Sequence, residues 1–261
     1  MPEETNFTIR KLLASARLVD VRRGLVLVER EIARVGSAEA RELFEVVSSL
    51  FYLDPLEQPS LAPIVDEAIT LVVGFGHWVI PALVEKLDAG DFKAQFAVAT
   101  ALGRIGADAI EPLLGAYARA EADEERRVFI LYALGKIKSP KVVAALPVVL
   151  SAAASPHAEA RDTATRALGK LAESIEPAAV ADEVRRAVIS RLRENLADAS
   201  SAIRAKAVRS LGKLAKFGHM TAGERAELRT LCERLLGTDE AYEWDRAYVV
   251  RREAEEALHY L

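Results

Sequence analysis

Hydrophobic positions recur along this 261-residue chain with helical spacing, and they recur in blocks. In each block, apolar residues stand three, seven and ten residues after a common reference position. These offsets trace one face of an α-helix. The blocks are TALGRIG (100–106), YALGKIK (132–138), RALGKLA (166–172), RSLGKLA (209–215) and a divergent EALHYL (256–261). The pattern predicts one helix per block, and therefore an internal repeat.

A second apolar run lies between consecutive blocks and predicts a partner helix for each. Three of these runs are clear: Val79–Leu87, Ala109–Ala118 and Val142–Ala153. Pro81 and Pro112 fall early, where proline costs no hydrogen bond, whereas Pro147 falls deeper and is expected to kink its helix. The chain therefore predicts a succession of antiparallel helical pairs.

Small residues also recur within the blocks, and they predict close helix packing. Alanine or serine stands six residues after the reference position in every block, where a neighbouring helix can come close (Ala101, Ala133, Ala167, Ser210 and Ala257). Recurrent glycines are assigned to helix packing or termination in the same way (Gly103, Gly106, Gly135, Gly169 and Gly212).

The block Arg161-x-x-Ala164-x-x-Ala167-Leu168-Gly169-x-Leu171, repeated from Arg204 to Leu214, resembles a HEAT repeat, particularly the bacterial HEAT-like repeats also found in phycobilisome lyases. The resemblance implies an all-α fold: a right-handed α-solenoid of about six to seven antiparallel helical pairs. It also implies that an arginine row (Arg127, Arg161, Arg204 and Arg251) reaches a turn acid or carbonyls of the neighbouring repeat. We expect a single solenoid domain over residues 1–261, with divergent pairs in 1–76, clear repeats in 77–218 and a capping pair in 219–261. Glu253, Glu255 and Glu256 are expected to put charge where a further repeat would dock.

The composition narrows the class of protein further. Hydrophobic residues make up 51% of the chain and charged residues 28%, which excludes general disorder. The single cysteine excludes an internal disulfide, and with no basic-then-apolar leader at the start we expect a cytoplasmic protein.

The formal net charge of −4 hides an uneven distribution along the chain. Residues 37–76 hold seven acids and one base, whereas residues 185–216 hold nine bases and two acids. Some cations fall at equivalent repeat positions, and we predict that they form a basic partner-binding ridge together with one tyrosine: Arg104, Tyr132, Lys136, Arg166, Lys170, Arg209 and Lys213. In HEAT-like stacks the second helix of each pair lines the concave surface, so the ridge is expected there. The competing interpretation is that lysines near helix C-termini only complement the helix dipole.

No residue pattern for catalysis or metal binding stands out. The four histidines lie in different repeats without zinc-ligand spacing, and Cys232 lies in an apolar helical stretch that favours a buried thiol. We therefore predict no catalytic residue, no metal and no cofactor. Trp244, with Tyr242 and Tyr248 near it, is an alternative contact surface.

Three hypotheses for function follow. The first is a non-catalytic scaffold or adaptor that binds another protein on its concave surface, with a preference for an acidic segment. The second is nucleic-acid or phosphate binding through the ridge, against which the sequence pI of about 5.7 counts. The third is a lyase-type enzyme of the HEAT-like family or an accessory subunit to one. No membrane partner is expected.

Overall fold

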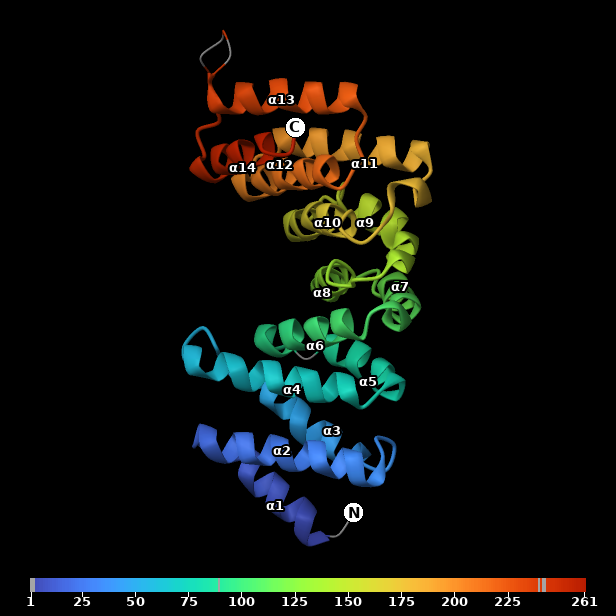
Figure 1. The fold of residues 1–261 in the computed structure, drawn as a ribbon, viewed down its shortest axis with the longest axis vertical. Coiled ribbons are helices and arrows are strands. Elements are labelled where there is room, and N and C mark those ends of the chain that lie inside the picture. The colour runs from blue at the N-terminus through green and yellow to red at the C-terminus, as the bar shows by residue number, and fades with distance from the viewer. Residues whose placement is uncertain (1–2, 89, 239, 241–242) are drawn as a thin grey trace. The chain divides into compact units, whose positions relative to one another are not determined.

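The computed structural model describes residues 3–88, 90–238, 240 and 243–261, and this part of the chain is all helical. It contains 14 α-helices and short 3₁₀ helices, with no strand among the described residues (Figure 1). The predicted all-α fold class is confirmed. The chain divides into two compact units, Met1–Ala116 and Tyr117–Leu261, and helix α7 (Ile110–Arg119) spans the boundary. The expectation of one domain stays a prediction.

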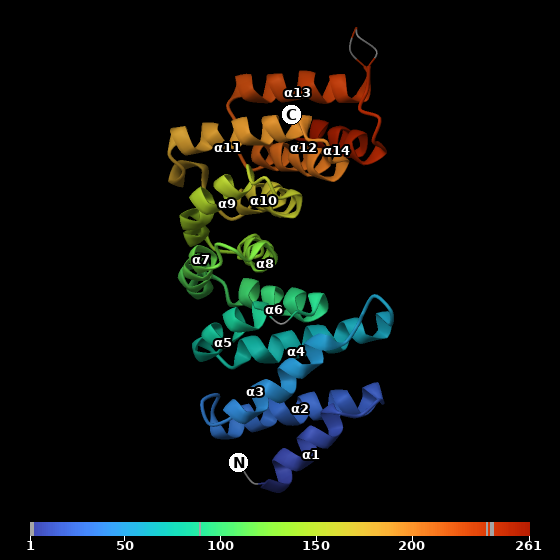
Figure 2. The same cartoon turned by 180° about the vertical axis from the view of Figure 1, so that it is seen from behind.

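The first unit is built from three helical pairs. They are α1 (Glu3–Leu13) with α2 (Leu18–Val35), α3 (Arg41–Ser48) with α4 (Ala62–Gly74), and α5 (Ile80–Glu85) with α6 (Phe92–Ile105). The second helices α2, α4 and α6 follow one another side by side (Figures 1 and 2). The rings of Phe44 on α3, Phe75 at the end of α4 and Trp78 in the turn before α5 meet edge to face at centroid distances of 5.6 to 6.2 Å.

The second unit also consists of helices that alternate between first and second members of a pair. Its helices are α8 (Glu124–Leu134), α9 (Leu146–Ala152), α10 (Ala158–Leu171), α11 (Asp182–Glu194), α12 (Ser201–Lys216), α13 (Ala222–Leu236) and α14 (Tyr248–Leu258). Helices α8, α10, α12 and α14 pack in succession, each against the next (Figure 2). These are the helices that the repeated blocks predict.

Glycine against a small side chain sets the distance between these second helices. A Cβ atom on Gly169 of α10 would lie 2.4 Å from Ser210 Oγ and 2.7 Å from Ser210 Cα on α12. A Cβ on Gly212 would lie 3.1 Å from the Cβ of Ala257 on α14. The glycine of one repeat thus packs against the small residue of the next, as the recurrent small positions predict.

Pro147 does not kink a helix, contrary to the expectation. The predicted helix over Val142–Ala153 is instead a 3₁₀ helix, Pro140–Ala145, followed by α9, in which Pro147 occupies the first turn. There the missing N–H would have had no partner within the helix, so proline is tolerated without distortion.

Two members of the arginine row, Arg161 and Arg204, tie one turn to the next, as the resemblance implies. Arg127 instead pairs with Glu124 of its own helix, and Arg251 donates to the Asp245 carbonyl of its own turn at 2.6 Å. Arg161 donates to the carbonyls of Ser155 and Pro156 at 2.8 and 2.9 Å, and its Nε donates to Asp198 at 2.9 Å. Arg204 repeats this one pair later, with Asp245 at 2.7 Å and the Asp198 carbonyl at 2.9 Å. Burial raises the pKa of Asp198, but hydrogen bonds led by that from Arg161 outweigh it, and the pKa is lowered.

The end of the second unit differs from the expectation in one respect. Glu253 was expected to face a missing repeat, but its residue is only 5% exposed and it pairs with Arg209 on α12. It therefore belongs to the contact between α12 and α14. Only Glu255 and Glu256 of this acidic group are exposed.

Among the described residues, no single helix is long and apolar enough to cross a bilayer. One pair of consecutive helical segments, Pro59–Gly74 and His77–Asp88, passes the test of length and composition together, and it is bent by 109°.

The glycine contact can be tested with two substitutions of the same kind. We expect Gly169→Ala to lower the free energy of unfolding by about 1–3 kcal/mol, because the backbone of Ser210 must move. Gly223→Ala on α13 is the control, since nothing lies within 4 Å of its Cβ position, and it should raise stability by about 0.4–1 kcal/mol. Urea unfolding measures both, and equal effects would contradict the packing role.

A truncation tests whether α14 covers the stack. Deletion of Gly237–Leu261 removes α14 from α12 and should expose the face around Leu211 and Leu214, which are 0% and 4% exposed in the full chain. We expect a lower unfolding midpoint and aggregation, measured by size-exclusion chromatography with light scattering. A truncated protein that stays monomeric and equally stable would contradict this.

Candidate functional site

The structure places the seven predicted ridge residues in two different units. Arg104 lies on α6 in the first unit, where it donates to Thr70 Oγ1 at 3.1 Å and pairs with Asp66. The other six lie in the second unit, on or just after α8, α10 and α12. We call these six the second-helix surface: Tyr132, Lys136, Arg166, Lys170, Arg209 and Lys213.

Tyr132 is the centre of the first group on this surface. The ammonium of Lys136 lies 4.9 Å from the centroid of the Tyr132 ring, and the guanidinium carbon of Arg166 lies 5.8 Å from it. Both distances fall within the range of cation–π attraction. Neither cation forms an ion pair with a described carboxylate, so both remain able to meet an anion from outside.

Glu173 is the centre of the second group, which sequence reasoning missed. It lies two residues after the end of α10 and accepts hydrogen bonds from Lys138 at 2.6 Å, from Lys170 at 3.3 Å and from Lys213. Burial favours the neutral acid, but hydrogen bonds from Lys138 and Lys213 outweigh it and lower the pKa of Glu173 to about 2. Burial in turn lowers the pKa of Lys213, and the neighbouring Lys170 adds to that effect.

Arg209 forms the third group with Glu253 of α14. Its Nε donates at 2.8 Å and its Nη2 donates to the second carboxylate oxygen, which gives a bidentate pair. This hydrogen bonding lowers the pKa of Glu253 and raises that of Arg209. Planar pairs of this kind are geometrically specific, so Arg209 is held in one orientation.

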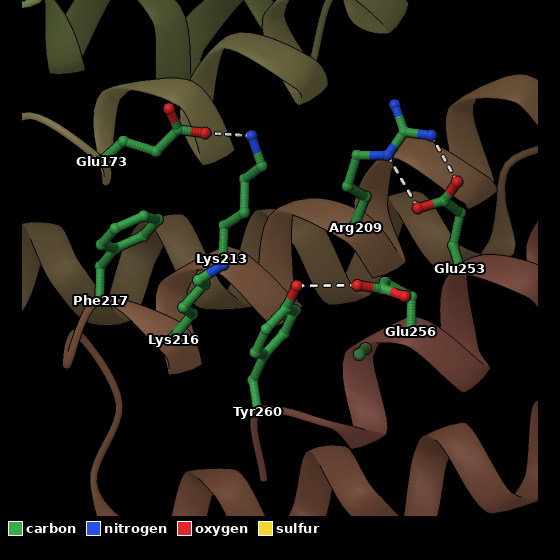
Figure 3. Close-up of a pocket in the computed structure, with 10 residues that line it drawn as sticks. Glu173, Arg209, Lys213, Lys216, Phe217, Glu253, Glu256 and Tyr260 are labelled. Carbon is green, nitrogen blue, oxygen red and sulfur yellow. Dashed lines mark hydrogen bonds and ion pairs between the residues drawn. The ribbon is translucent and has the colours of Figure 1, made fainter.

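A pocket of about 210 Å³ opens between these last two groups (Figure 3). Gly212 and Ala257 line it together with Lys216, Phe217 and Tyr260. The Lys216 ammonium lies 4.6 Å from the Tyr260 ring centroid, and the Tyr260 hydroxyl donates to Glu256 at 2.8 Å. Lys213 and Glu173 meet at one wall, and Arg209 and Glu253 meet at another.

The sequence carries a signal for two of the missed residues. In the alignment of EALHYL with RSLGKLA, Glu256 stands at the position of Arg209, and Tyr260 stands at that of Lys213. The rows that predicted the ridge therefore continue onto α14, but with an acid and an aromatic residue.

Most of the basic excess in residues 185–216 is compensated inside the second unit. Seven of its nine bases form ion pairs with carboxylates: Arg185, Arg191, Arg193, Arg204, Lys206, Arg209 and Lys213. The charge asymmetry along the sequence therefore overstates the charge that this segment presents to a partner.

The residues considered for catalysis, for metal binding or as an alternative contact surface have the following environments. Cys232 is buried, and burial raises the pKa of its thiol to about 12. His219 is buried with Nε2 at 3.1 Å from the Ala172 carbonyl oxygen. Among the described residues, no group of three His, Cys, Asp or Glu side chains could hold a metal ion. Trp244 and Tyr248 are 60% and 68% exposed, while Tyr242 lies outside the described residues.

The fold defines an α-helical repeat solenoid protein, and comparison with solved structures agrees with that class. An engineered protein of known structure aligns with 100% of this chain and 96% of its own, at 20% identity and a TM-score of 0.52. A designed armadillo repeat protein aligns with 97% of this chain and 98% of its own, at 16% identity and a TM-score of 0.50. No protein-family model matches the chain. No curated protein sequence matches it either.

From the charge of Glu173 we predict how the free energy of unfolding depends on pH. Its pKa is depressed in the folded protein, so its stabilising effect is present above about pH 4.5 and is lost as the pH falls towards 2. We expect Glu173→Gln to cost about 1–3 kcal/mol at pH 7, and the difference from the parent to shrink between pH 4.5 and pH 2. Urea unfolding across this range measures it. A difference that does not change with pH would contradict a charged role for Glu173.

Proposed function

We propose that this protein is a non-catalytic scaffold or adaptor that binds an acidic segment of another protein on the second-helix surface. The proposal rests on one observation. The six residues of this surface lie on or just after α8, α10 and α12, three second helices that pack in succession within one unit. Repeat stacks use such extended surfaces for partner binding.

The charges on and around this surface support an acidic partner. Seven cations and three carboxylates lie on it and around the pocket: Lys136, Lys138, Arg166, Lys170, Arg209, Lys213 and Lys216 against Glu173, Glu253 and Glu256. Complementary charge steers the encounter and rejects partners of the wrong sign. Tyr132 adds a ring that can stack on a partner side chain or a peptide group.

The finer parts of the proposal rest on the repeat pattern. Three expectations come from the sequence alone. They are the assignment to HEAT-like repeats of the phycobilisome-lyase type, a concave position of the second-helix surface, and a cytoplasmic location. The likeness to an engineered protein and to a designed armadillo repeat protein supports the fold on which these expectations depend.

The test uses three cations that form no ion pair in the described part of the chain. The variant Lys136→Gln/Arg166→Gln/Lys216→Gln removes them while the pairs at Glu173 and Glu253 stay in place. We expect its affinity for a labelled octaglutamate peptide, measured by fluorescence anisotropy, to fall at least about tenfold, or roughly 1.4 kcal/mol. The fold should survive, because exposed charges contribute little to stability.

The matched control removes the same number of charges from other elements of the second unit. Lys141, Arg186 and Arg225 are exposed on the 3₁₀ helix before α9, on α11 and on α13. Their triple change to Gln should alter affinity less than about twofold at 0.15 M salt, where distant exposed charges are screened. Equal losses in both variants would overturn the assigned surface. A salt slope typical of phosphate neutralisation, with tighter binding of single-stranded DNA than of octaglutamate, would favour nucleic acid instead.

A further inference from the structure

Three lysines share one carboxylate in the second unit, and this excess of positive charge supports an inference that goes beyond general binding of an acidic segment. Lys138 follows α8, Lys170 lies on α10 and Lys213 lies on α12, and all three donate to Glu173. We call Lys138, Lys170 and Lys213 the lysine cluster. With one negative charge against three positive ones, the group keeps an excess of two positive charges.

The three lysines of the cluster differ in how far their side chains are exposed to solvent. The side chain of Lys213 is 19% exposed, that of Lys170 is 35% exposed and that of Lys138 is 61% exposed. Lys213 also lines the pocket of Figure 3, where Lys216 follows it by one helical turn without a described carboxylate partner. An anion arriving from solvent can therefore reach ammonium groups that are partly desolvated, where electrostatic attraction is stronger than in bulk water.

We infer that the lysine cluster is a binding site for the phosphate of a phosphorylated side chain in the partner segment. A phosphate monoester carries nearly two negative charges at pH 7 and three acceptor oxygens, which matches the excess charge and the three donors. A single carboxylate supplies half that charge. This inference rests on the proposed function, since it places the phosphate within a docked acidic segment.

Glu173 has a defined part in this site. Its carboxylate accepts from all three ammonium groups, so it occupies donors that a phosphate would take. The same carboxylate repels an incoming phosphate and competes with it for donors. Removal of the charge of Glu173 should therefore tighten phosphate binding, whereas removal of a lysine should weaken it.

The experiment compares three synthetic acidic peptides by isothermal titration calorimetry at 0.15 M salt. One carries a phosphoserine, the second has serine at that position, and the third has the serine and two additional glutamates, so that its net charge matches the first. We expect the phosphopeptide to bind at least about tenfold more tightly than the charge-matched peptide.

Two variants with the same change in charge locate the effect. Glu173→Gln should tighten phosphopeptide binding at least about threefold, because it frees three donors. Glu256→Gln removes one negative charge from the same pocket, where the partner of Glu256 is the neutral Tyr260 hydroxyl, and should change affinity by less than about twofold. Lys170→Gln, at a side chain that is 35% exposed, should reduce the preference for the phosphopeptide at least about fivefold. Circular dichroism checks that each variant is folded.

The outcomes separate this inference from the proposed function. Equal affinity for the phosphopeptide and the charge-matched peptide would overturn the phosphate site and leave the acidic-segment proposal standing. Weaker phosphopeptide binding by folded Glu173→Gln would also overturn the site, since Glu173 would then support the ligand rather than compete with it. Failure of all three peptides to bind the parent protein would overturn both.

Discussion

The close approach of consecutive second helices is the constraint on which the second unit depends. Gly169 meets Ser210, and Gly212 meets Ala257, at distances that leave no room for a larger side chain. Helices in such close contact must keep one register, because a shift by one residue would place a bulky side chain against the glycine. The register then decides which side chains of neighbouring helices stand next to each other. The surface chemistry of the unit is in this sense a consequence of its packing.

Long side chains at equivalent positions meet because the register is fixed. Lys170 and Lys213 occupy one repeat position on adjacent helices, and both reach the same carboxylate of Glu173. Burial lowers the pKa of Lys213, and the like charge of Lys170 close to it lowers that pKa further. A regular stack therefore concentrates whatever charge its consensus repeats, and here an acid outside the consensus partly neutralises it. Arg209 and Glu253 show the same arrangement between α12 and α14.

The repeated features of this protein could be predicted from the sequence, and the unrepeated ones could not. The second helices, the small packing positions and the arginines at Arg161 and Arg204 recur in register, so a comparison of copies finds them. Glu173 occurs in one copy only, and its equivalent in the next repeat is Lys216. A comparison of equivalent repeat positions does not identify such a residue, although three of the lysines donate to it. The position of Pro147 within its helix was also mispredicted. The pattern of apolar residues does not distinguish a preceding 3₁₀ helix from the first turns of an α-helix.

The two interpretations of the lysine row, helix-end electrostatics and partner binding, are not exclusive in this structure. Lys170 lies in the last turn of α10 and Lys213 in the last turn of α12, where a cation complements the helix dipole. The dipole and one glutamate together still leave an excess of positive charge around Glu173, because each helix end contributes only about half an elementary charge. Lys136 and Arg166 lie over the ring of Tyr132, whose quadrupole attracts them without neutralising them. The structural explanation thus accounts for the positions of these cations, and the charge that remains is what a negatively charged partner can use.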